Sequence, residues 1–325
     1  MSSYNLVRER IQTWQIVVCA TVSAYLALGV ATKSIRGYHW LMLLAIPAAL
    51  WAWRIGRQFF IDWAPLFAFW MVYDRLRLIQ PHLLDRVAVK TPYLLEQWAF
   101  GWMAGGEVPA HAARAWLAAH SEMPVWAAAS WAAQLIYLSH VAILPLLFLP
   151  WWWKGRRDDA YRKRFTIHMR GFFALHLLGI CIYLLLPVAP PWWVGLYGMA
   201  QPSAELLAQT KMSAAMDGVI VQNLIQNASH WFAAVPSLHG AYPVLLLLLS
   251  IKDRSRFIIG LLSVYAAAMW VTTVILNQHY IVDLFAGAVI AVIAWWFARN
   301  GLPFFKGRTG RDEQTEALLC SSAGN

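Results

Sequence analysis

The sequence predicts an all-α protein, a bundle of helices that crosses a membrane about eight times. Of its 325 residues, 60% are hydrophobic and only 13% are charged, whereas about 25% of the residues of a soluble domain carry charge. The mean hydropathy is correspondingly high, at +0.50. The apolar residues form long blocks, which favours helices, because a membrane β-barrel would show alternating segments of about ten residues.

Eight apolar segments account for the predicted spans. The first follows basic residues, as the core of a signal peptide does, but its length of about 18 residues and the later spans favour a membrane anchor. The second and third segments are short for a complete span. By residue number the eight segments are 14–31, 39–53, 59–73, 124–153, 171–186, 242–251, 257–276 and 281–297.

Two stretches between the spans are of a different kind. Residues 74–123 mix charged residues with Leu, Trp and Ala, which predicts amphipathic helices at the membrane interface or folded back into the protein. Residues 187–235 form a long loop that carries little charge. The pair Trp192 and Trp193 in this loop predicts contact with lipid headgroups.

Basic residues set the predicted orientation. The net charge of +10 could indicate nucleic-acid binding, but most of the 26 Lys and Arg residues lie in short connections and at the termini. Placing both termini in the cytoplasm puts most of them inside, as the positive-inside rule requires. The chain then divides into N-terminal membrane helices (1–58), a membrane domain (59–300) and a disordered cytoplasmic tail (301–325). The three cysteines have no disulfide or metal-binding spacing.

Two short stretches place a histidine at the mouth of an apolar segment, both on the predicted outer face. They read Ala-Val-Pro-Ser-Leu-His-Gly (234–240) and Asn-Gln-His-Tyr-Ile-Val-Asp (277–283). Ionisable groups at the edge of a span are costly and therefore indicate function. At a spacing of four, His279 and Asp283 share a helical face, so that the carboxylate can orient the imidazole and stabilise its positive charge.

These residue types suit phosphoryl transfer. His279 would attack phosphorus and form a phosphohistidine, while His239 would donate a proton to the leaving oxygen and later take one from the acceptor. Ser237 is placed to cap the following helix, and helix starts bind phosphate through free N–H groups, so Ser237 and Gly240 are expected to bind phosphate. The scheme needs no metal and no cofactor. Each stretch alone could equally be a buried pair, a helix cap or half of a metal site.

At these residues the chain resembles the type 2 phosphatidic acid phosphatase superfamily, which carries Pro-Ser-x-His in one stretch and His-x-x-x-Asp in another. The resemblance implies a phosphohistidine mechanism with His279 as nucleophile, Asp283 as its orienting group and His239 as general acid. It also implies a core of six helices, here with additional N-terminal helices. The matching residues are Pro236, Ser237, His239, His279, Asp283 and Gly287.

The chain departs from this superfamily where the phosphate is usually clamped. It has no Lys…Arg-Pro stretch before the first histidine, and Thr272 and Thr273 replace the usual Ser-Arg pair. Further segments resemble the inositol phosphorylceramide synthase-like branch, and these are 73–77, 137–140, 184–192 and the start of the second histidine stretch. Candidates for the missing substrate-binding groups are Arg77 first, then Arg75 and His140.

The resemblance therefore implies a lipid phosphatase or phosphotransferase in the plasma membrane, acting at the extracytoplasmic face on a lipid phosphate or a phosphoinositol-type lipid. An inositolphosphoryl sphingolipid synthase proper is one alternative. A non-enzymatic transporter or remnant of the fold is another, and a metal hydrolase built on the same three side chains is a third. The expected partner is a membrane lipid and not a nucleic acid, and the oligomeric state stays open.

Overall fold

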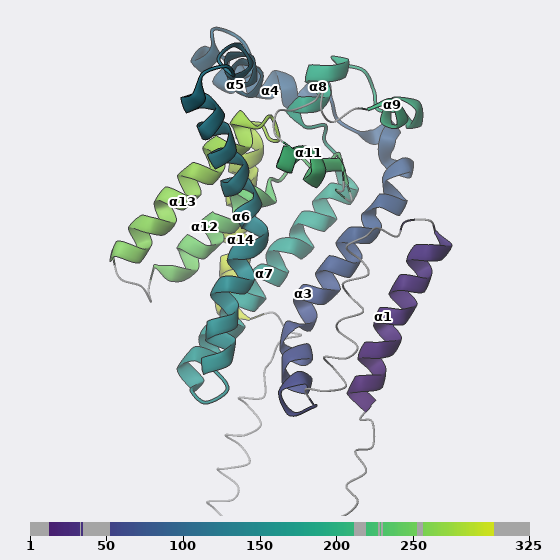
Figure 1. Cartoon of the computed structure of the whole chain (residues 1–325), viewed down its shortest axis with the longest axis vertical. Helices are drawn as coiled ribbons and strands as arrows, with labels where there is room; N and C mark the ends of the chain where they lie inside the picture. The colour runs from purple at the N-terminus through teal and green to yellow at the C-terminus, as the bar shows by residue number, and fades with distance from the viewer. Residues whose placement is uncertain are drawn as a thin grey trace, which may run out of the picture. The chain divides into compact units, whose positions relative to one another are not determined.

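The computed structural model describes residues 13–32, 34, 53–210, 219–226, 228, 230–251 and 256–301. This part of the chain is helical and contains no extended strand, which confirms the all-α class (Figure 1). The chain divides into two compact units, Met1–Val72 and Tyr73–Asn325, with the boundary inside one helix. The predicted second span, apart from its last residue, lies outside the described residues.

The first unit contains helix α1 (Thr13–Ala31) and the beginning of helix α3 (Trp53–Ile79). Its aromatic side chains contact one another: Phe59 stacks on Trp63 with ring centroids 5.4 Å apart. Helix α3 is longer than the apolar segment that predicted it. The polar residues after position 73 continue this helix for two turns instead of starting a separate interfacial helix.

The second unit is built on five long or apolar helices. Helix α12 packs against α14, α13 and α7, while α14 also packs on α7, and α6 packs on α7 and α13. A side chain at Gly287 of α14 would collide with the carbonyl oxygen of Ser237, so glycine is needed for this close packing. The bounds are α6 (Pro124–Lys154), α7 (Asp159–Leu185), α12 (Leu238–Ser250), α13 (Arg256–Ile275) and α14 (Ile281–Asn300).

Four described helices are long and apolar enough to cross a membrane: α1, α7, α13 and α14. Helix α12 is apolar but shorter, with 13 residues, and the count of eight spans stays a prediction. Helix α7 begins well before its apolar part, because the Asp158 side chain accepts a hydrogen bond from the Ala160 N–H (2.8 Å) and caps the helix there. The connection between the predicted spans 124–153 and 171–186 is therefore helical from Asp159 onward.

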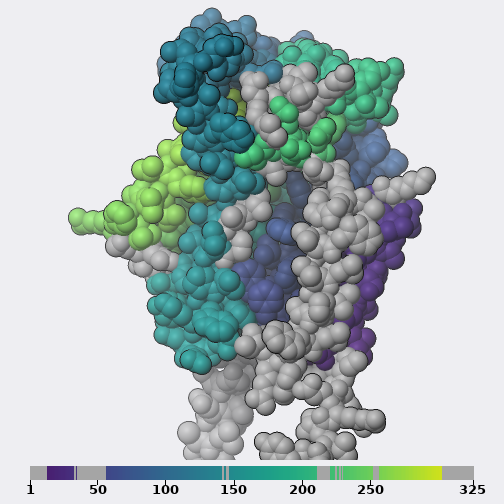
Figure 2. All heavy atoms as spheres, in the orientation of Figure 1, coloured from purple at the N-terminus to yellow at the C-terminus, as the bar shows by residue number. Residues whose placement is uncertain are grey.

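Short helices cover the end of the second unit toward which the C-terminus of α13 points (Figure 1). Figure 2 shows the side chains of α5, α8 and α9 over this end. Residues 80–119 form short helices, as the amphipathic pattern predicted. The bounds are η2 (Gln80–Arg86), α4 (Lys90–Phe100), η3 (Gly101–Ala104), α5 (Pro109–Ala119), α8 (Pro191–Tyr197), α9 (Ala204–Gln209) and α11 (Val219–Gln226).

The predicted headgroup contact of Trp192 and Trp193 is wrong. Both side chains are buried, at 1% and 0% exposure, in an apolar cluster that includes Phe232 and Leu276. The indole N–H of Trp193 donates to the carbonyl of Ala200 (2.9 Å). The long loop is therefore packed into the core of the second unit, and its two indoles are buried among residues from other parts of the chain.

Candidate active site

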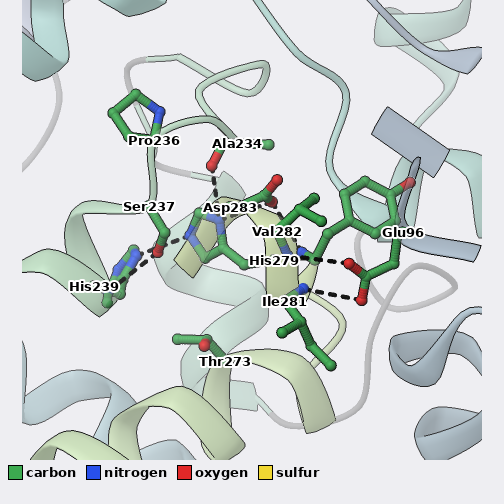
Figure 3. Close-up of polar contacts among 12 residues, drawn as sticks. Glu96, Ala234, Pro236, Ser237, His239, Thr273, His279, Ile281, Val282 and Asp283 are labelled. Carbon is green, nitrogen blue, oxygen red and sulfur yellow. Dashed lines mark hydrogen bonds and ion pairs between the residues drawn. The ribbon is translucent and has the colours of Figure 1, made fainter. Parts of the chain in front are cut away.

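Two histidines from distant parts of the chain meet where α12 begins and where the chain turns from α13 into α14 (Figure 3). His239 lies in the first turn of α12, and His279 lies two residues before α14. Nδ1 of His239 is 3.1 Å from Nε2 of His279, within hydrogen-bonding distance. The structure therefore brings the two predicted catalytic imidazoles together.

The turn before α14 holds His279 in place through backbone hydrogen bonds. The carbonyl oxygen of Thr273 accepts from the N–H groups of Gln278 (2.9 Å) and His279 (3.3 Å). Asn277 takes a positive φ of 60°, which allows this tight turn. The side chains of Thr272 and Thr273 are buried and uncharged, so neither supplies the cation that the superfamily has at this point.

The orientation of the His279 ring follows from the groups around its Nδ1 atom. This nitrogen lies 3.0 Å from the carbonyl oxygen of Ala234 and 3.4 Å from Oδ2 of Asp283. Because a carbonyl oxygen only accepts, Nδ1 must carry the proton, and Nε2 is left with its lone pair directed at His239. His279 precedes the helix, so its contact with Asp283 crosses the start of α14 and does not run along one helical face as predicted.

Asp283 is fully buried and belongs to the first turn of α14. Its Oδ2 atom accepts from the N–H of Tyr280 (2.9 Å), as an acidic residue at the third position of a helix commonly does. Its Oδ1 atom has no hydrogen-bond partner among the described residues. One carboxylate thus both caps the helix and faces the His279 ring.

Two aromatic rings from α6 enclose His239. Tyr137 stacks on it with ring centroids 4.5 Å apart and an interplanar angle of 22°. His140 meets the same ring edge-on at 4.3 Å and forms a hydrogen bond to the Tyr137 carbonyl through its Nδ1. His140, expected as a substrate-binding residue, therefore lies beside the histidine pair, and its role stays a prediction.

Ser237 connects the two helices that carry the site. Its hydroxyl oxygen accepts from the Gly240 N–H (3.1 Å), which is the cap that the sequence predicted, and its own N–H donates to the Asp283 carbonyl (3.0 Å). A Cβ atom at Gly240 would come within 2.8 Å of Leu284. Phosphate binding by Ser237 and Gly240 stays a prediction, and it would require their mutual hydrogen bond to open.

The two candidate arginines lie at the C-terminal end of α3. Arg77 forms an ion pair with Asp74, and its Nε donates to the Asp74 carbonyl (2.9 Å). Nε of Arg75 is 3.9 Å from the same carboxylate. Asp74 thus holds both guanidinium groups beside α3. The bonds to Asp74 do not connect either arginine to His239 or His279. Their role as a phosphate clamp stays a prediction.

Sequence reasoning missed Glu96, a fully buried residue of α4. Its two carboxylate oxygens accept from the N–H groups of Ile281 and Val282 at the start of α14, each at 3.0 Å (Figure 3). Burial raises the pKa of Glu96, and the two N–H bonds act against this rise. The N–H groups of Tyr280, Ile281 and Val282 at the start of α14 are therefore bound by carboxylates of the protein itself.

The fold and the chain's relatives together define the class of enzyme to which the protein belongs. The sequence model of the PAP2 superfamily matches residues 106–297, more than half of the chain. The chain belongs to the PAP2 superfamily. The protein is an integral membrane enzyme, a lipid phosphatase or phosphotransferase, and not the transporter or remnant that the sequence left open. Among the described residues, no group of three or more His, Cys, Asp or Glu side chains is arranged to hold a metal ion.

Several relatives carry names that describe a synthase. The chain is 28% identical over 297 residues to the phosphoinositol dihydroceramide synthase of Bacteroides thetaiotaomicron, covering 90% of this chain and 93% of that protein. It is 28% identical over 135 residues to the inositol phosphorylceramide synthase of Candida albicans, covering 40% and 28% of the two chains. The catalytic subunit of the Schizosaccharomyces pombe inositol phosphorylceramide synthase is 29% identical over 139 residues, covering 40% of this chain and 32% of that protein. No solved structure matches the chain significantly.

Proposed function

We propose that this enzyme transfers a phosphoryl headgroup between lipids through a phosphohistidine intermediate on His279. The observation that carries the proposal is the 3.1 Å approach of His239 Nδ1 to His279 Nε2, with Nδ1 of His279 held by Ala234 and Asp283. Nδ1 of His279 is thereby held in place, and its Nε2 becomes available for attack once His239 turns its proton to the leaving oxygen. A second imidazole is within reach of whatever group bonds to that nitrogen.

The first half-reaction forms a bond from Nε2 of His279 to phosphorus and breaks the bond from phosphorus to the leaving oxygen. The imidazolium form of His239 donates a proton to that oxygen and becomes neutral, so that an alcohol leaves and not an alkoxide. The positive charge that develops on the His279 ring is balanced by the nearby carboxylate of Asp283. In the second half-reaction an acceptor hydroxyl attacks phosphorus, His239 takes the hydroxyl proton, and the bond from phosphorus to nitrogen breaks.

The acceptor decides between a phosphatase and a synthase. The relative that matches nearly the whole chain is named a phosphoinositol dihydroceramide synthase. We therefore favour a phosphoinositol-type lipid as donor and a ceramide-type alcohol as acceptor. Water as the acceptor would give a lipid phosphatase from the same residues, because both histidines serve either nucleophile.

A trapping experiment tests the mechanism. Purified protein is incubated with phosphoinositol lipid labelled at phosphorus, quenched, and analysed for a protein-bound label that is stable to base and labile to acid. Wild-type protein should carry the label, His279→Ala should lose label and turnover together, and the exposed control His82→Ala should behave as wild type. Turnover that persists in His279→Ala refutes the mechanism. Adding a ceramide or omitting it then distinguishes transfer from hydrolysis.

The site is proposed to face the extracytoplasmic side of the plasma membrane, with both termini in the cytoplasm, on the charge distribution alone. Single cysteines at two exposed positions test this in a variant whose three native cysteines are replaced by serine. In sealed right-side-out vesicles an impermeant maleimide should label Glu107→Cys directly. It should label Arg157→Cys only after the vesicles are opened. The reverse order of labelling would invert the topology.

A further inference from the structure

The start of α14 depends on a side chain from a distant part of the chain. Glu96 lies 185 residues before Ile281 in the sequence, yet its Oε1 accepts from the Ile281 N–H and its Oε2 from the Val282 N–H, both at 3.0 Å. Both bonds join α4 to the helix that carries Asp283. In Figure 3 the Glu96 carboxylate faces these two N–H groups from the side opposite His239.

Helix α14 has few means of its own to satisfy its first N–H groups. The first four N–H groups of a helix have no partner within the helix, and Ser, Thr, Asp or Asn at the N-cap commonly supplies one. Here the N-cap residue is Tyr280, whose side chain makes no capping bond. Among the N–H groups at the start of the helix, the Asp283 side chain accepts from that of Tyr280. The next two N–H groups are satisfied from α4.

The position of Glu96 on α4 shows that the carboxylate is not an ordinary surface charge. Its neighbours Leu94, Leu95 and Trp98 are exposed, while Glu96 itself has 0% exposure. A carboxylate is rarely buried unless it is paired or hydrogen-bonded, because removing it from water is costly. The helix thus turns apolar groups outward and its one acidic group toward the site.

We propose that Glu96 is a positioning residue for phosphoryl transfer, which keeps Asp283 available to His279 by occupying the N–H groups of Ile281 and Val282. The inference rests on the proposed function of the histidine pair. Without Glu96, these two N–H groups would lose their partners, and the Asp283 carboxylate belongs to the same helical turn and already accepts from the neighbouring Tyr280 N–H. Asp283 would be drawn toward them and away from Nδ1 of His279, at present 3.4 Å from it.

The proposal predicts a loss of rate without a loss of substrate binding. The carboxylate of Glu96 is bound by the backbone N–H groups of Ile281 and Val282, so the KM for a labelled phosphoinositol lipid should stay within about twofold of wild type. The kcat of Glu96→Ala should fall on the order of 100-fold, the effect expected when a catalytic group is displaced by about 1 Å. Glu96→Gln retains one accepting oxygen, so its kcat should fall less. The kcat values should therefore decrease in the order wild type, Glu96→Gln, Glu96→Ala.

Two control variants separate positioning from stability. Glu107→Gln removes an exposed carboxylate from the same region and should leave kcat unchanged. Val108→Ala removes buried methyl groups from the small cluster that includes Ala110 and Tyr280, and should lower the melting temperature while retaining kcat. If Glu96→Ala lowers the melting temperature as Val108→Ala does and keeps a wild-type kcat, the positioning role is refuted. A tenfold rise in KM with unchanged kcat refutes it as well.

A failure of the Glu96 proposal can be distinguished from a failure of the phosphohistidine mechanism. Turnover that survives in His279→Ala would overturn the phosphohistidine proposal, and the role of Glu96 with it. Turnover that is abolished in His279→Ala but normal in Glu96→Ala would leave the mechanism standing and overturn only the positioning role. Label trapping supplies an additional readout, because Glu96→Ala should accumulate the protein-bound label more slowly and to the same final amount.

Discussion

His239 and His279 share a hydrogen bond of 3.1 Å although 40 residues separate them in the chain. The bond joins the start of one helix to the turn before another, and Ser237 and Gly287 hold these two backbones in contact. Since Nδ1 of His279 carries a proton, the bond must be donated by His239. The bond therefore places the Nδ1 proton of His239 beside the unprotonated Nε2 of His279.

Replacement of His239 should slow only the steps that move a proton. His239→Gln should lower turnover of a natural lipid by roughly 100-fold to 10,000-fold, the usual contribution of general acid-base catalysis. With a substrate whose leaving group is p-nitrophenolate, which needs no proton, the initial burst of release should be nearly normal. Rapid quenching measures that burst. An equal loss with both leaving groups would contradict the acid role of His239.

His140 provides a test of the predicted substrate contact beside His239. If its ring donates to the substrate phosphate, His140→Phe should raise KM by about tenfold, the value of one charge-assisted hydrogen bond, while kcat changes little. Phenylalanine keeps a ring edge against His239, so the packing is preserved. Steady-state kinetics decide the matter, and an unchanged KM would show that His140 only packs against His239.

Arg77 is the first candidate for the missing phosphate clamp. Arg77→Ala should raise KM for an anionic lipid by about 10-fold to 100-fold, because a charge-assisted bond to the phosphate is lost. Arg77→Lys should recover part of this loss, since lysine retains the charge but not the planar fork. Arg75→Ala serves as the neighbouring comparison and should have the smaller effect. Normal affinity in Arg77→Ala would require the clamp to be sought elsewhere.

His230 should make the stability of the protein sensitive to acid. Burial lowers the pKa of His230 from its ordinary value of 6.5 to about 4, and its Nδ1 accepts a hydrogen bond from the Phe232 N–H (3.1 Å). The folded state therefore favours the neutral ring. The neutral ring contributes its full stabilisation above pH 6.5, and this contribution is lost as the pH falls from 6.5 toward 4. The free energy of unfolding should be about 2 kcal/mol lower at pH 5 on this account.

The variant His230→Gln cannot titrate and keeps an oxygen that can accept from Phe232. Melting temperatures in detergent, followed by tryptophan fluorescence between pH 7.5 and pH 5, should fall less for this variant than for wild type. His82→Gln, an exposed histidine, should follow the wild-type curve. Parallel curves for wild type and His230→Gln would show that His230 does not contribute to the acid sensitivity.

The sequence was a good guide where the signal is local. Apolar blocks indicated the helical class, and Ser237 indicated the start of α12, because a cap forms between neighbours in the chain. The same reasoning placed Trp192 and Trp193 at the membrane interface. They are buried, since local composition does not say which tertiary surface an indole will meet.

The amino-acid sequence was enough to identify the membrane-embedded helical class, the superfamily, and the two stretches that hold His239, His279 and Asp283. The folded chain was needed to show that the two imidazoles meet through specific ring nitrogens, and that Glu96 occupies the start of α14. The difference comes from distance along the chain. A helix cap or an apolar period depends on residues a few positions apart, whereas a bond across 185 residues depends on how whole helices pack.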